Sequence, residues 1–87
     1  MTFTIHYGTL IDWKKFRKLP SNDKHRLKQA IEQKLMNDPL HFGKPLRQSL
    51  KGHRSLRVGE YRIIYRVEKE VVEILLFGHR SNVYSDV

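Results

Sequence analysis

The chain has 87 residues, no cysteine and a formal net charge of +8, with 17 Lys and Arg against 9 Asp and Glu. This length predicts a single domain over residues 1–87, and the lack of cysteine excludes a disulfide scaffold and a cysteine-ligated metal or redox centre. The apolar runs are too short to cross a bilayer, and the first residues carry no signal-peptide pattern. We therefore expect a small cytoplasmic domain with an acidic partner and no membrane partner.

The first half of the chain predicts one strand and two helices. Apolar and polar residues alternate over residues 3–7, as in a strand with one apolar face. Thr9 and Asp12 have the spacing of a capping box, which predicts a short helix over about residues 9–18. A second helix is expected over about 21–37, and its inner stripe consists of Leu27, Ala30, Ile31, Lys34 and Leu35. The two helices would form a helical hairpin.

The second half predicts a loop followed by three strands. Residues 38–52 contain prolines, glycines and apolar anchors and are interpreted as a loop. The strands are expected over residues 55–58, 61–67 and 71–77. Their short connections indicate an antiparallel meander. The order strand, helix, helix and three strands predicts an α+β fold, in which a small antiparallel sheet carries the helical hairpin on one face.

The positive charge is concentrated in residues 44–67, which hold seven Lys and Arg and one acidic residue, Glu60. Strand alternation places Arg62 and Arg66 on one face of their strand, and Arg57 can project from the same face of the sheet. A guanidinium group suits bidentate phosphate contacts, so this pattern favours a phosphate-binding surface. Two plainer interpretations stay open: a solvated basic face, and an ion pair of Arg62 with Glu60 or Glu73.

After the last strand the sequence places three functional groups close together. His79, Arg80 and Tyr84 supply an imidazole, a guanidinium and a phenol, which could join Arg57 and Arg62 in a cationic cleft. His79 could also be a strand-end histidine and Tyr84 a packing residue. The five histidines lack metal-ligand spacing, and neither a carboxylate pair nor a Gly-rich phosphate loop is evident. We therefore expect no metal and no cofactor.

Three segments together resemble the RelE/ParE superfamily of toxins from bacterial type II toxin–antitoxin systems, with the RelE branch favoured. They are Leu50-Lys51-Gly52, the run LRVGEYRIIY at 56–65 and the run GHRSNVY at 78–84. The resemblance implies a RelE-like fold. In the RelE branch it also implies a ribosome-dependent endoribonuclease that inhibits translation by cleaving messenger RNA without a metal. In that reaction the 2′-hydroxyl of the RNA attacks the adjacent phosphate.

The resemblance also implies roles for individual residues. Arg62 and Arg80 would stabilise developing negative charge, Tyr84 would stack on a base or move a proton, and His79 is an alternative acid or base. The expected RNA or phosphate contacts are Lys51, Arg54, Arg57 and Arg66. Some RelE-type toxins place two lysines where this chain has His53 and Ser55, which is a departure from their pattern.

The partners implied by the resemblance are the ribosome, messenger RNA and a cognate acidic antitoxin that would form a hetero-oligomer with the toxin. Two other functions stay open. One is a ParE-like, non-enzymatic inhibitor of DNA gyrase, which would share the same fold. The other is an RNA-binding or ribosome-binding module without catalysis. The combination of Arg62, Arg80 and Tyr84 favours the ribonuclease.

Overall fold

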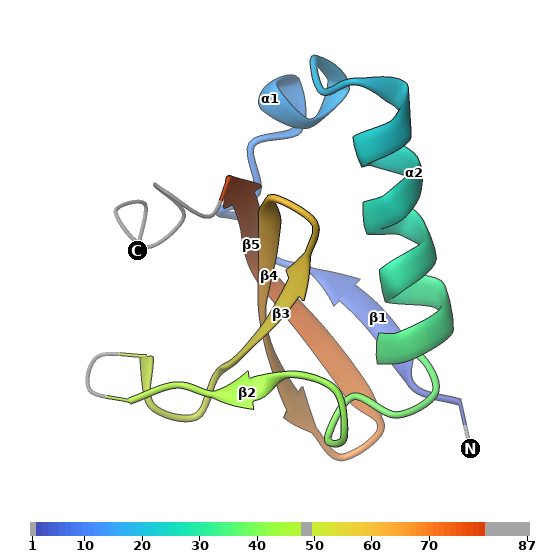
Figure 1. The fold of residues 1–87 in the computed structure, drawn as a ribbon. Helices are drawn as coiled ribbons and strands as arrows, with labels where there is room; N and C mark the ends of the chain where they lie inside the picture. Colours follow the sequence, from blue (N-terminus) through green and yellow to red (C-terminus); the bar gives the residue numbers. More distant parts are fainter. Residues whose placement is uncertain (1, 48–49, 80–87) are drawn as a thin grey trace.

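The computed structural model describes residues 2–47 and 50–79, which form a sheet with helices on one side (Figure 1). The expected α+β class is confirmed. In chain order the elements are β1 (Thr4–Tyr7), α1 (Trp13–Arg17), α2 (Ser21–Ala30), the π-helical turn η1 (Ile31–Leu35), β2 (Lys44–Pro45), β3 (Arg54–Val58), β4 (Tyr61–Glu68) and β5 (Val71–His79). In this part of the chain, no helix is long and apolar enough to cross a membrane.

The five strands lie in the order β1-β5-β4-β3-β2. Strands β3, β4 and β5 form the expected antiparallel meander. β1 pairs in parallel with β5, from Thr4 opposite Val71 to Tyr7 opposite Ile74. The helices provide the long crossover that a parallel pair requires. The first strand therefore closes one edge of the sheet against the last.

The first helix is shorter than the sequence pattern predicts. It begins at Trp13, because the side chain of Asp12 caps its N-terminus by accepting hydrogen bonds from the amides of Lys14 and Lys15 at 3.0 and 3.2 Å. The predicted capping box at Thr9 is wrong. An extended conformation at Asp12 (φ −90°, ψ 94°) is what an N-cap residue requires, and it separates Thr9 from the helix.

The second helix changes its winding before it ends. The α-helical part stops at Ala30, and residues 31–35 continue as a π-helix instead of the regular α-helix expected to residue 37. The predicted inner stripe is confirmed for Leu27, Ala30, Ile31 and Leu35, which are buried. It is wrong for Lys34, which is exposed and whose ammonium lies 5.5 Å from the centre of the Phe42 ring.

Two clusters of apolar side chains lie on opposite faces of the sheet. The main core joins α2 and η1 to Leu56, Ile63, Tyr65, Val72 and Ile74. A smaller cluster on the other face contains Ile64 and Leu76, with Leu46 and Leu75 packed against them. A bulge in the β4–β5 register, between Ile64 and Tyr65, accompanies this second cluster. We call the face that carries Ile64 and Leu76, opposite the helices, the open face.

The segment predicted as a loop contains a short strand that the sequence pattern missed. β2 has only two residues, with Lys44 opposite Ser55 and Pro45 opposite Arg54. Two residues are too few for the alternation that identifies a strand in a sequence. β5 is also longer than predicted, because it continues through Gly78 to His79.

Candidate nucleic-acid interface

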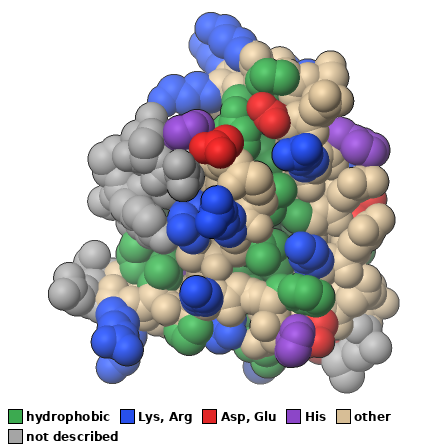
Figure 2. Space-filling model, viewed as in Figure 1, with side chains coloured by type: hydrophobic (Ala, Val, Ile, Leu, Met, Phe, Trp, Pro, Cys, Tyr) green, Lys and Arg blue, Asp and Glu red, His purple; other side chains and the backbone are tan. Residues whose placement is uncertain are grey.

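Arg57 and Arg62 lie directly opposite each other on β3 and β4. Opposite residues of an antiparallel pair share a face, and Ser55 and Ile64 form the next pair on that same face. The two arginines therefore occupy the open face. Figure 2, which looks onto the β2–β3 edge of the sheet, shows Lys and Arg side chains in several separate places, among them the region of β2 and of the β3–β4 hairpin.

The Arg62 side chain is held by a neighbouring strand. Its Nη1 donates a hydrogen bond of 3.4 Å to Oγ of Ser55, whose side chain is buried at 4% relative exposure. In the described part of the chain the carboxylates that could have paired with Arg62 contact other groups. Glu73 pairs with Arg66, and Glu60 lies 3.9 Å from His79. The ion pair considered for Arg62 is therefore not the arrangement in this structure.

Arg66 lies on the same face but its charge is balanced. Its guanidinium contacts Glu73 at 3.1 Å and Glu68 at 3.4 Å. His6 on β1 contacts the other oxygen of Glu73 at 3.5 Å. The open face is thus divided into a cationic half around Arg57 and Arg62 and a balanced half around Glu73. Arg66 is therefore less suited to bind an anion than Arg57 or Arg62.

Arg54 lies on the opposite face from Arg57. It is three residues before Arg57 on β3, and strand alternation therefore directs it to the helix side. Its Nη2 donates to the carbonyl oxygens of Leu40 and Gly43, both at 2.9 Å. Arg54 therefore anchors the segment before β2, and the structure separates it from the cationic half of the open face. Lys51 is exposed before β3, as an RNA contact would need to be.

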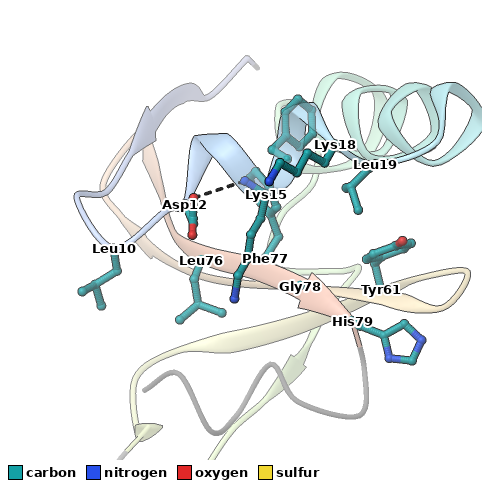
Figure 3. A pocket seen from close by; sticks show the side chains of 11 residues that line it. Leu10, Asp12, Lys15, Lys18, Leu19, Tyr61, Leu76, Phe77, Gly78 and His79 are labelled. Carbon is teal, nitrogen blue, oxygen red and sulfur yellow. Dashed lines mark hydrogen bonds between the residues drawn. The ribbon is translucent and has the colours of Figure 1, made fainter.

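His79 also lies away from Arg62. It is opposite Tyr61 at the end of β5, and the two rings meet edge to face with their centres 5.8 Å apart. Arg62 is opposite Gly78, one position earlier, and so faces the other side of the sheet. Figure 3 shows His79 beside Tyr61 at the rim of a pocket of about 570 Å³ between α1 and β5. The predicted convergence of His79 with Arg62 does not occur in this structure.

The environment of Tyr61 disfavours its ionised form. Burial raises the pKa of the Tyr61 hydroxyl, and the hydrogen bond to Asp23 and the charges of Asp23 and Glu60 raise it further. The hydroxyl donates to Oδ2 of Asp23 at 3.2 Å. Tyr61 therefore stays protonated near neutral pH and has a structural role between α2 and β4.

Arg80 and Tyr84 lie outside the described residues. The cationic site described here therefore consists of side chains that β2, β3 and β4 position. Within the described ranges, no group of three or more His, Asp or Glu side chains is arranged to hold a metal ion.

Sequence reasoning missed one cation of this site, Lys44. It is opposite Ser55, so it shares the open face with Ser55 and Arg57. The side chain is exposed. Its signal in the sequence was only its place among the basic residues of 44–67, since the two-residue strand that positions it gives no pattern. The site therefore combines Lys44, Arg57 and Arg62, whose grouped positive charge suits a polyanion.

Comparison with known proteins identifies the fold and the family. A family model described as "ParE toxin of type II toxin-antitoxin system, parDE" matches residues 10–84. Toxin RelG of Mycobacterium tuberculosis is 35% identical over 86 residues, which cover 97% of this chain and 98% of that toxin. Toxin RelE of the same organism is 42% identical over 52 residues, which cover 58% of this chain and 54% of that toxin.

Solved structures agree with these sequence relatives. A chain of the toxin–antitoxin complex RelBE2 from M. tuberculosis superposes with a TM-score of 0.81 at 33% identity, covering 92% of this chain and all (100%) of that one. A mutant of Escherichia coli toxin RelE in the free state superposes with a TM-score of 0.72 at 26% identity, covering 99% of this chain and 94% of that one. The chain therefore belongs to the RelE/ParE superfamily of toxins from type II toxin–antitoxin systems.

Proposed function

We propose that this toxin cleaves messenger RNA on the ribosome and so stops translation. The observation that carries the proposal is the opposed pair Arg57 and Arg62 on the open face, where Glu73 contacts Arg66 and Glu60 contacts His79. The proposal is supported by similarity to a toxin named RelG over most of the chain and to a toxin named RelE over more than half of it.

The reaction proposed is an internal transfer within the RNA. The 2′-oxygen attacks the adjacent phosphorus and forms an O2′–P bond, while the P–O5′ bond breaks. The 2′-hydroxyl loses its proton to a base, and the departing 5′-oxygen gains one from an acid. The products are a 2′,3′-cyclic phosphate and a 5′-hydroxyl end.

Negative charge increases on the phosphoryl oxygens as the bond to the 2′-oxygen forms. Arg62, which Ser55 fixes in place, would stabilise this charge, and Arg57 would hold the same or a neighbouring phosphate. Arg80 and Tyr84 enter the proposal from the sequence resemblance, Arg80 as a further cation and Tyr84 as the group that stacks on a base or moves a proton. We leave His79 out of the proton transfer because it contacts Tyr61 on the other side of the sheet.

The test is inducible expression with mapping of messenger RNA ends. We expect new RNA ends within codons for the wild type. For Arg62→Ala we expect the rate of cleavage to fall on the order of 10²–10³-fold, because one preorganised donor at a developing charge contributes this much. Lys28→Ala, which removes an exposed lysine from α2, is the matched control and should cleave normally. If the wild type produced growth arrest without new ends, the ribonuclease proposal would be wrong, and either RNA or ribosome binding without catalysis or inhibition of DNA gyrase would replace it.

A second candidate is inhibition of DNA gyrase through protein contacts. The matching family model, which is described as a ParE toxin, favours it. A supercoiling assay with the purified protein separates the two. Inhibited supercoiling with intact messenger RNA would support the gyrase function.

The partner proposed for either function is a cognate acidic antitoxin. The net charge of +8 favours an acidic partner, and the similar RelBE2 structure is a toxin–antitoxin complex. Co-expression with the neighbouring reading frame should yield a stable hetero-oligomer and restore growth.

A further inference from the structure

We propose that Lys44 binds the RNA phosphate next to the one that is cleaved, and so positions the substrate on the open face. This inference rests on the proposed function and names a further substrate contact for it. The first observation is the register. Lys44 is opposite Ser55, and Arg57 follows Ser55 by two residues on the same face of β3.

The backbone on both sides of Lys44 is fixed. Before it, the carbonyl of Gly43 accepts a hydrogen bond of 2.9 Å from Arg54, and the carbonyl of Pro39 accepts one of 2.6 Å from the buried hydroxyl of Tyr65. After it, the amide of Leu46 donates to the carbonyl of His53 at 2.9 Å. A strand of only two residues is therefore held from both ends.

Side-chain packing confirms the face on which Lys44 lies. Leu46, two residues further on, packs against the cluster of Ile64 and Leu76 on the open face. Residues two apart in an extended segment point to the same side, so the packing of Leu46 also places Lys44 on the open face. The described part of the chain places no acidic side chain in an ion pair with Lys44, whereas it pairs Arg66 twice.

The spacing of the strands determines what Lys44 can reach. Lys44, Ser55 and Ile64 are opposite one another, which puts about 10 Å between Lys44 and β4, and Arg62 lies two residues further along β4. A lysine is a flexible point charge and an arginine a planar fork. This separation suits two cations that bind successive phosphates of one strand better than two that bind a single phosphate. Ser55, which lies between Lys44 and Ile64, carries no charge.

The experiment measures how strongly salt weakens binding of a short single-stranded RNA, with its 2′-hydroxyls methylated to prevent cleavage. One lost phosphate contact makes the slope of log affinity against log salt less steep by about 0.7. We expect this change for Lys44→Ala, near-complete recovery for Lys44→Arg, and no change for Lys28→Ala on the helix side. Circular dichroism and urea unfolding confirm that each variant is folded.

The cleavage assay adds a second readout. A contact to a flanking phosphate holds the ground state and the transition state alike, so Lys44→Ala should raise KM and leave kcat nearly unchanged. An unchanged salt slope, or an equal change for Lys28→Ala, would overturn the role of Lys44. These results are distinct from failure of the proposed function, in which the wild type itself would produce no new RNA ends.

Discussion

Arg57 and Arg62 are directly opposed across β3 and β4, so two positive charges occupy one cross-strand pair. Like charges in this position destabilise a sheet by up to about 1 kcal/mol. The neighbouring Arg66 shows the opposite arrangement, because it is opposite Glu73 and bonded to it at 3.1 Å. The sheet therefore has a stabilising charge pair at one end and a destabilising pair at the other.

Replacing Arg57 with Thr should stabilise the protein and weaken its RNA binding. The substitution removes the repulsion from Arg62, and threonine suits a strand, so we expect the free energy of unfolding to rise by roughly 0.2–1 kcal/mol. The lost hydrogen bond from Arg57 Nε to the carbonyl of Gly59, at 3.4 Å, is long and exposed and offsets little of this gain. Urea unfolding measures the change in the free energy of unfolding, and the salt dependence of RNA binding measures the weakened binding.

Arg66→Thr is the matched control for Arg57→Thr. It removes the contacts to Glu73 and Glu68 and should lower the free energy of unfolding, so the two variants change stability in opposite directions. Both differences should shrink in high salt, because the charges are partly exposed. If Arg57→Thr were less stable than the wild type at low salt, the result would contradict a destabilising repulsion between Arg57 and Arg62.

Ser55→Ala should reduce RNA cleavage without exposing or removing Arg62. The hydroxyl accepts the hydrogen bond that fixes the Arg62 guanidinium, and a misplaced donor stabilises developing charge less well. We expect kcat to fall a few-fold, since a bond as long as 3.4 Å contributes about 0.5–1 kcal/mol. Ser55→Thr, which keeps a hydroxyl, should retain most of the activity. If Ser55→Ala cleaved RNA as fast as Ser55→Thr and the wild type, a positioning role for Ser55 would be excluded.

Gly43→Ala should destabilise the segment that leads into β2. A Cβ at this position would overlap the hydroxyl and ring of Tyr65, which is fully buried at 0% exposure. We expect a loss of about 1–3 kcal/mol, as for other overpacked sites. The double variant with Tyr65→Phe tests the cause, because removing the hydroxyl relieves part of the overlap. The double variant should lose less unfolding free energy than the sum of the losses in the two single variants. A loss equal to that sum would mean that the two sites are independent.

Stability should fall as the pH rises above about 10, the pKa of a tyrosine in the unfolded chain. Burial raises the pKa of Tyr61 and of Tyr65, so both stay protonated in the folded protein while their unfolded forms ionise. The unfolded state therefore gains stability over this range, whereas below it the contribution is present in full.

Tyr61→Phe isolates this effect from the titration of the lysines. Its free energy of unfolding should decline less between neutral pH and the alkaline range than that of the wild type. Urea unfolding at a series of pH values makes the measurement. Parallel curves for the two proteins would show that Tyr61 does not contribute.

The fold class and the main strands could be predicted from the sequence, because local pattern determines them. The alternation over β4 and the helical spacing of Leu27, Ile31 and Leu35 reflect burial of one face, which acts residue by residue. The start of α1 was misplaced because Thr9 and Asp12 both suit a helix cap, and only the extended backbone at Asp12 selects between them. β2 could not be predicted, because a strand of two residues is too short to show a periodic pattern.

Composition and periodicity alone predict a small basic α+β domain with arginines on the strands of a meander. The folded chain is needed to show which cations lie together, because register depends on hydrogen bonds between segments that are distant in the chain. Register places Lys44 beside Ser55 and Arg57 opposite Arg62. It also turns Arg54 towards the loop carbonyls and pairs Arg66 with Glu73, so cations that look equivalent in the sequence have different surroundings.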